Sequence, residues 1–267
     1  MISVSASAVG VPLHVPMPAL SDTLPNSGSM VGVVFGVGIV MTFIATKGIA
    51  GIMRFANFVG PWIVVGFIAL GIVALNRLHI HSWNEFWQTA TSSIWPGRNQ
   101  PGYVKFTFWH VLFFAWFGNM AWHIGMGDLS FFRYAKKAYY GITSAAGMFL
   151  GHYIAWIAAA LLYAVQLQQN PANTVVAPGL MANDAGGFPA VLLVAGWATG
   201  NPLIYRAVLA FQSLRPTWSR TRLTILSGIL STVVAIFPAL SMKFLSVAAL
   251  YGLILMPMGR SSSLIII

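Results

Sequence analysis

Polar side chains interrupt an otherwise apolar stretch of the sequence at residues 116–128. This stretch, WFGNMAWHIGMGD, carries Asn119, His123 and Asp128 within ten residues. An ionisable or amide group inside an apolar span is costly, so it normally faces protein or a water-filled cavity and is a candidate for function. Trp116, Asn119 and His123 are spaced i, i+3 and i+7, which places them on one helix face. The chemistry this face offers is hydrogen bonding and ring stacking to a small polar solute.

Three glycines, Gly118, Gly125 and Gly127, lie around these polar residues. Each glycine weakens a helix by about 1 kcal/mol relative to alanine, so together they predict a helix that is interrupted near mid-membrane. In transporters such interruptions free backbone carbonyls for cations and turn half-helix ends toward a polar solute. The alternative is structural: the glycines allow close helix packing, and Asn119 bonds a neighbouring helix.

A second polar site of the same kind is predicted within AGWATGNPLIYRAVLAFQ, residues 195–212. Two glycines and the Asn201-Pro202 pair break the helical pattern here, and Pro202 frees the carbonyl of Ala198 four residues earlier. Freed carbonyls and the hydroxyl of Thr199 make the all-oxygen environment that a hard cation prefers. The alternative is a simple proline kink, with Thr199 bonding its own helix.

The remaining polar residues do not form the arrangements used in catalysis. The sequence holds no paired carboxylates, no Gly-x-Ser-x-Gly elbow, no Walker sequence and no cysteine. Without cysteine there is no thiolate nucleophile and no thiolate ligand for zinc or an iron–sulfur cluster. We therefore expect no enzyme, no cofactor and no metal site other than one for Na+.

The composition is that of an integral membrane protein. Hydrophobic residues make up 58% of the 267 residues, charged residues 7%, and mean hydropathy is +0.78. A soluble domain carries roughly 25% charged residues, so this chain has too few to coat a water-facing surface. We interpret the formal charge of +10 as basic membrane loops and not as a nucleic-acid surface. The expected location is therefore a plasma membrane or bacterial inner membrane, crossed several times.

Stretches of mostly apolar residues predict an all-α membrane protein with about seven transmembrane helices. The seven predicted spans are residues 30–46, 58–75, 107–127, 141–166, 187–210, 223–240 and 244–258. Before them, residues 1–29 contain four prolines and are predicted to be an irregular leader or the remnant of a lost helix. After them, residues 260–267 form an atypical tail.

Basic residues between the spans predict the orientation of the chain. Loops 47–57, 128–140 and 206–222 together hold nine Lys and Arg residues, and the alternate loops 76–106, 167–186 and 241–243 hold four. Cytoplasmic loops carry the excess of Lys and Arg, so the first set is expected inside and the start of the chain outside.

Three stretches resemble one family of membrane transporters. Residues 119–164 (NMAWHIGMGDLSFFRYAKKAYYGITSAAGMFLGHYIAWIAAALLYA) are similar to the sixth and seventh helices of the nucleobase–cation symporters related to purine–cytosine permeases. ATGNPLIYRAVLAFQ, residues 198–212, resembles their eighth helix, and ALYGLILMPMG, residues 249–259, their tenth. The resemblance covers residues 30–259, and the helix directions it implies agree with the charge count. It implies a partial LeuT-like, inverted-repeat bundle.

The resemblance also implies a substrate class and a set of site residues. The family takes up flat heterocycles, namely nucleobases, hydantoins and allantoin, with Na+ or H+ as the coupling ion. It stacks the ring on an aromatic side chain and reads the ring edge with amides. The resemblance assigns Asn119, Asn201 and a ring from Trp116 or Trp122 to the substrate, and the helix face described above adds His123. The residues that it assigns to the cation are Ala195, Ala198 and Thr199.

The chain also departs from the family pattern at both ends. Nothing matches the family's first three helices, which supply part of the cation site and key ring-binding residues, and the pattern stops after Gly259. We expect a truncated or frame-shifted member that does not perform coupled uptake alone, because alternating access needs both repeats around one site. The alternative is a non-transporting helical subunit of a membrane complex, in which Asn119 and His123 join helices.

Overall fold

The computed structural model describes residues 1–18, 22–94, 97, 107–119, 132, 134–171, 189–240 and 250; the side chains of residues 114 and 117–119 are not among them. The chain divides into two compact units. Unit 1 comprises Met1–Pro96 and Met148–Leu240, and unit 2 comprises Gly97–Gly147 and Ser241–Ile267.

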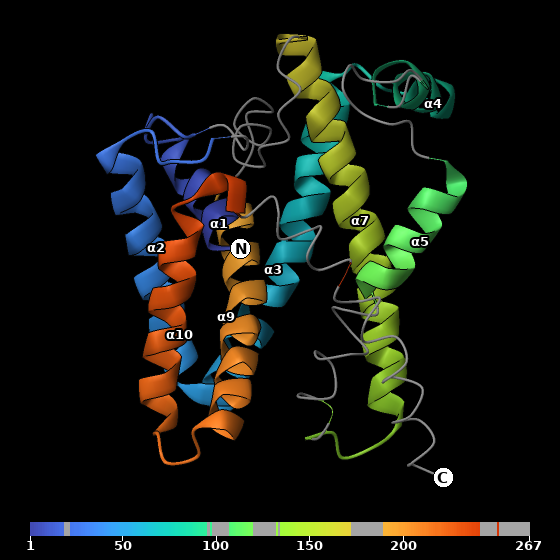
Figure 1. Cartoon of the computed structure of the whole chain (residues 1–267). Helices are drawn as coiled ribbons and strands as arrows, with labels where there is room; N and C mark the ends of the chain where they lie inside the picture. The colour runs from blue at the N-terminus through green and yellow to red at the C-terminus, as the bar shows by residue number, and fades with distance from the viewer. Residues whose placement is uncertain are drawn as a thin grey trace. The chain divides into compact units, whose positions relative to one another are not determined.

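All the regular structure in the described residues is helical, which confirms the predicted all-α class. Unit 1 contains α1 (Ile2–Gly10), α2 (Gly28–Thr46), α3 (Gly48–Arg77), α4 (Trp83–Thr89), a short π-helix (Ala90–Ile94), α9 (Pro189–Leu214) and α10 (Arg220–Ala235), as Figure 1 shows. Unit 2 contains α5 (Phe108–Asn119), and α7 (Tyr139–Gln169) begins in unit 2 and continues into unit 1.

Three helices, α2, α3 and α7, are long and apolar enough to cross a membrane. They correspond to the predicted spans 30–46, 58–75 and 141–166. Of the other predicted spans, 187–210 falls within α9, 223–240 overlaps α10, and 107–127 begins as α5. Residues 120–127 and almost all of span 244–258 lie outside the described residues.

The boundary between α2 and α3 differs from the prediction. We expected a loop over residues 47–57, but α3 begins at Gly48 and only Lys47 separates the two helices. Gly48 has φ +66°, a conformation that glycine adopts without steric cost, so the chain reverses there in a single step. Pro61 then lies inside α3, where a membrane helix tolerates it.

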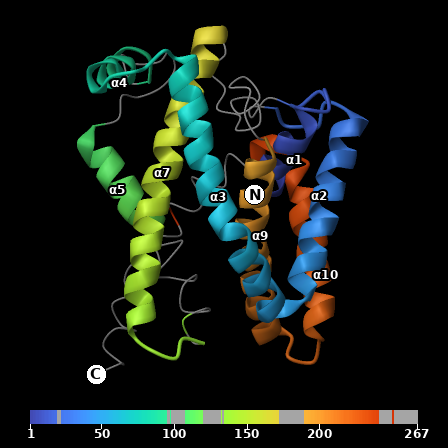
Figure 2. The same ribbon diagram turned by 180° about the vertical axis from the view of Figure 1, so that it is seen from behind.

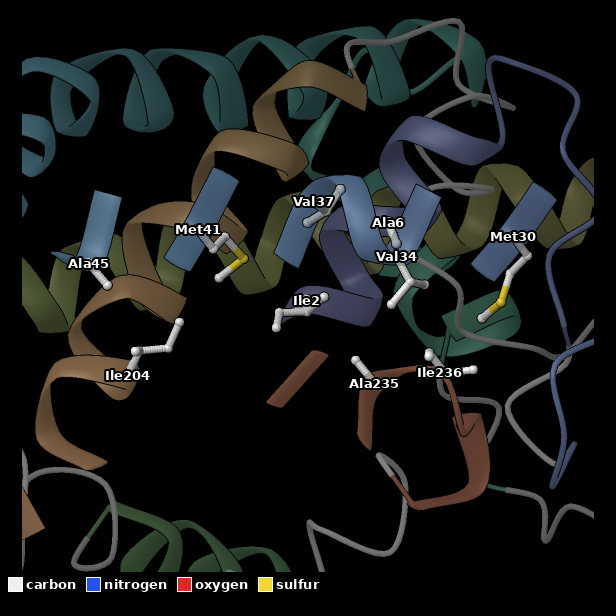
Figure 3. Close-up of a cluster of buried hydrophobic side chains, with 10 residues drawn as sticks. All are labelled: Ile2, Ala6, Met30, Val34, Val37, Met41, Ala45, Ile204, Ala235 and Ile236. Carbon is white, nitrogen blue, oxygen red and sulfur yellow. The ribbon is translucent and has the colours of Figure 1, made fainter. Parts of the chain in front are cut away.

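The main core of unit 1 joins α1, α2, α9 and α10. Figure 3 shows side chains from these four helices converging on a cluster formed by Ile2, Ala6, Met30, Val34, Val37, Met41, Ala45, Ile204, Ala235 and Ile236. Within residues 1–29, for which we expected a leader or a helix remnant, residues 2–10 are thus helical and packed into the core. Burial of Ile2 and Ala6 against α2 and α9 explains why this short segment is held as a helix.

A second cluster joins α3 to the part of α7 that lies in unit 1. Leu70 and Ala74 of α3 pack against Leu161, Leu162 and Val165 of α7. Around these clusters many large apolar side chains stay exposed, including Phe58 at 73% and Ile39 at 66%. An apolar exterior of this kind is consistent with a membrane protein.

Candidate functional site

Helix α9 carries four of the predicted site residues and is continuous from Pro189 to Leu214. The prediction that the Asn201-Pro202 pair breaks this helix is therefore wrong. Pro202 removes its own N–H and leaves only the carbonyl of Ala198 without its helical donor. The helix continues through this local loss because its neighbours pack tightly against it on both sides of the proline.

The glycines of α9 serve that packing. A methyl group at Gly196 would overlap the side chain of Ser5 in α1, and one at Gly200 would overlap Met41 in α2. Ser5 also donates a hydrogen bond of 3.3 Å from its hydroxyl to the carbonyl of Leu193. The spacing of Gly196 and Gly200 is that of a small-xxx-small contact, which lets helix backbones approach closely.

Thr199 bonds its own helix, as in the proline-kink alternative. Its hydroxyl is exposed and donates to the carbonyl of Ala195 at 3.0 Å. Ala195 and Ala198 are half-buried. Thr199 and Asn201 are two residues apart and thus point to nearly opposite sides of the helix. The candidate cation residue and the candidate substrate residue on α9 therefore occupy different faces.

Asn201 is a fully buried polar residue among the described residues of unit 1. Its side chain is 0% exposed, and neither amide atom, Nδ2 or Oδ1, has a hydrogen-bond partner among the described residues. An unsatisfied buried polar group costs about 1–3 kcal/mol, so it calls for an explanation. One turn earlier on the same face, the buried indole Nε1 of Trp197 also has no partner within the described part of the chain.

A third such group, Ser227, comes from α10. Its side chain is 3% exposed and its buried Oγ has no partner in the described residues. Its neighbour Gly228 packs on Thr42 of α2, next to Met41, on which Gly200 of α9 packs. Ser227 also lines a small pocket with Phe211, Arg215 and Trp218, beyond Asn201 toward the C-terminal end of α9. We call Trp197, Asn201 and Ser227 the buried polar layer.

The sequence prediction included Asn201 and missed the other two members of this layer. Trp197 could have been found from its i, i+4 spacing to Asn201. No local signal identifies Ser227, because a serine in an apolar helix often bonds its own backbone, as Thr224 and Thr232 do on the same helix. Its unpaired state depends on how α10 packs.

The predicted site residues of the third span belong to the segment assigned to unit 2. Trp116 lies in α5 of unit 2 and is 49% exposed. Asn119 is the last residue of α5, and its side chain lies outside the described part, as do Trp122 and His123 entirely. Of the predicted site residues, those whose surroundings are fully described in unit 1 are therefore the four of α9.

Outside the apolar helices, one carboxylate has a well-defined environment. Glu85 closes a capping box at the start of α4, where its Oε2 accepts from the backbone N–H of His81 at 2.6 Å and of Ser82 at 3.1 Å. The hydrogen bond from His81 is the main reason that the pKa of Glu85 falls below its usual value. This carboxylate thus acts as a helix cap.

Comparison with family models, with curated proteins and with solved structures finds no match to this chain.

Proposed function

We propose that the chain is part of a secondary transporter for purine or pyrimidine bases or related flat heterocycles such as cytosine, hydantoin or allantoin. The observation that carries the proposal is the buried polar layer. An amide with free donor and acceptor atoms, an indole N–H and a hydroxyl are buried in unit 1. A polar solute that reaches these groups would pair them and remove their desolvation cost.

The chemistry of the layer suits the edge of a heterocycle. Nucleobases and hydantoins present a hydrogen-bond donor beside an acceptor on one planar edge, and an asparagine amide pairs with such an edge through two parallel bonds. The indole of Trp197 adds a ring as well as a donor, and stacking of a base on an aromatic ring is worth about 1–3 kcal/mol. The sequence resemblance to nucleobase–cation symporters supports the same solute class.

The coupling ion proposed for this transporter is Na+ or H+, and the cation residues are Ala195, Ala198 and Thr199 of α9. Pro202 leaves the carbonyl of Ala198 without a helical donor. The hydroxyl of Thr199 donates to Ala195 and keeps its oxygen lone pairs for a cation. Other oxygen ligands for the ion would come from elements packed against that face.

Solute binding to the purified chain tests the proposal most directly. The purified chain, in detergent or nanodiscs, is heated with cytosine, adenine, hydantoin or allantoin. A solute at about 100 times its Kd stabilises the folded state by ~2.7 kcal/mol, and this shift should vanish in Asn201→Leu. Asn76→Leu, which removes an exposed amide at the end of α3, is the matched control. Absence of a shift with all four solutes would refute the heterocycle class.

Sodium is tested in the same assay with a matched pair of threonines. Thr199 and Thr143 are both exposed and both donate to a carbonyl of their own helix, at 3.0 Å in each case. Thr199→Val should remove any Na+-dependent stabilisation, while Thr143→Val should retain it. Equal Na+ effects in the two variants would remove Thr199 from the cation site.

The second candidate function is a non-transporting helical subunit of a membrane complex. The tight contacts at Gly196 and Gly200 favour it, because they give these glycines a packing role without any solute. Under this alternative, Asn201→Leu would alter stability but no solute-dependent shift would exist in the parent chain.

A further inference from the structure

A groove runs along the outside of unit 1 between α2 and α10. These two helices lie side by side in both views of the molecule (Figures 1 and 2). The groove has a volume of about 460 Å³ and is lined by Phe35, Gly38, Ile39, Thr42, Phe43, Thr46, Thr221, Ile225, Ile229 and Thr232. None of its lining residues belongs to the buried polar layer.

The walls of the groove are apolar and exposed. Phe35 is 41% exposed, Ile39 66% and Ile229 53%, so the groove opens outward along the two helices. Three of the threonines that line it direct their hydroxyls to carbonyls of their own helices: Thr42 to Gly38 at 2.7 Å, Thr46 to Phe43 at 2.6 Å, and Thr232 to Gly228 at 2.7 Å. Such a surface binds a hydrocarbon chain better than a polar solute.

One end of the groove is basic. Lys47 follows directly after Thr46, and its Nζ lies 4.5 Å from the centroid of Phe43, a ring that lines the groove. On the other wall, Arg222 directly follows Thr221, which lines the groove, while its guanidinium lies over the ring of Trp218. Both cations are exposed, and each has an aromatic neighbour: Phe43 for Lys47 and Trp218 for Arg222.

The described carboxylates lie away from this end. The backbone carbonyl of Asp22 accepts from Ala239, beyond the C-terminal end of α10, and Glu85 caps α4, beyond the C-terminal end of α3. Helices α10 and α3 both begin at the basic end. The α2–α3 turn and the α9–α10 connection lie together there, at the lower end of Figure 1. Among the described residues, the positive charge at this end is thus not neutralised by a carboxylate.

We infer that the groove between α2 and α10 binds a phospholipid with an anionic headgroup. The phosphate lies at Lys47 and Arg222, and an acyl chain runs along Ile39 and Ile229. Basic sites between membrane helices on the cytoplasmic side bind anionic headgroups, and the loop charges predict that this end faces the cytoplasm. Two cations without carboxylate neighbours favour a net negative headgroup over a zwitterionic one.

Native mass spectrometry of the full chain in a neutral detergent tests this inference. Phosphatidylglycerol and phosphatidylcholine with the same acyl chains are added in equal amounts, and the ratio of bound lipids is measured. We expect phosphatidylglycerol to be preferred, and the preference to fall about fivefold for each of Lys47→Gln and Arg222→Gln. Arg77→Gln, which removes one exposed cation at the C-terminal end of α3, is the charge-matched control and should leave the ratio unchanged.

A second variant tests the acyl part of the site without changing charge. Ile229→Trp fills the groove and should weaken phosphatidylglycerol binding while both cations remain. The inference is overturned if the Lys47→Gln, Arg222→Gln double variant keeps the lipid preference. It is equally overturned if Arg77→Gln lowers the preference as much as Lys47→Gln or Arg222→Gln does, because the effect would then be general electrostatic attraction. Unchanged binding in Ile229→Trp would remove the groove from the site.

Discussion

Thr232 of α10 lies over Gly38 of α2, so closely that a methyl group on the glycine would overlap the threonine side chain. The contact is reciprocal, since Thr42 of α2 covers Gly228 of α10 in the same way. Each threonine also bonds the carbonyl of the glycine on its own helix at 2.7 Å. Two Gly-xxx-Thr segments therefore interlock. Each threonine hydroxyl is hydrogen-bonded within its own helix and needs no partner on the other helix.

This interlock predicts a large difference between two neighbouring glycines. Gly38→Ala should destabilise the protein by about 1–3 kcal/mol, the usual result of overpacking a tight contact. Gly36, on the same helix, has open space where a methyl group would be added. Gly36→Ala should be neutral or stabilising by up to ~1 kcal/mol, because alanine favours the helix. Thermal unfolding in detergent measures both, and equal effects would argue against the interlock.

Asn201→Leu should stabilise the protein when no solute is present. The substitution replaces an unsatisfied buried amide by an apolar side chain of similar size, and the expected gain is about 1–3 kcal/mol. Denaturant or thermal unfolding measures it, with Asn76→Leu as an exposed control expected within about 0.5 kcal/mol of the parent. If Asn201→Leu instead lowers the free energy of unfolding by more than about 1 kcal/mol, the amide forms hydrogen bonds in the folded chain. That result would contradict its unpaired state in the buried polar layer.

The capping box of α4 should weaken in acid. Because its folded pKa is lowered, Glu85 contributes stability that is present above the ordinary glutamate pKa and lost as the pH falls through the folded pKa. Glu85 is the only glutamate in the chain, so ¹³C labelling of glutamate carboxyls gives one NMR signal to titrate. Its midpoint should lie below that of a free glutamate.

Ser82→Ala provides the control for this titration. It removes the hydroxyl that accepts from the Glu85 backbone N–H at 3.2 Å and so loosens the box. The midpoint should move up toward the ordinary value. A parent midpoint at or above that of free glutamate would contradict the capping geometry.

The orientation can be tested by cysteine labelling, because the chain contains no cysteine of its own. Thr217→Cys places a thiol in the exposed connection between α9 and α10, and Ser93→Cys places one in the exposed segment after α4. The positive-inside rule predicts that an impermeant maleimide labels Ser93→Cys in intact cells and Thr217→Cys only after permeabilisation. The reverse pattern would invert the orientation and place the basic end of the groove outside.

The sequence alone determined the class of the protein and the location of its polar residues. Hydrophobic runs and scarce charges are local properties summed over a segment, so they predicted the helical class and the spans now seen as α2, α3 and α7. The proline at position 202 was equally visible, and so was Asn201 beside it.

Tertiary structure alone decided what those residues do in the fold. Whether Pro202 interrupts α9 depended on helices packed around it, and whether Gly196 and Gly200 loosen the backbone or admit a neighbour depended on Ser5 and Met41, which are distant in sequence. The buried polar layer arises in the same way, because a polar atom is unsatisfied only relative to the side chains that surround it. Such contacts are made between separate helices, so the sequence of one helix does not show which side chains will surround a given residue.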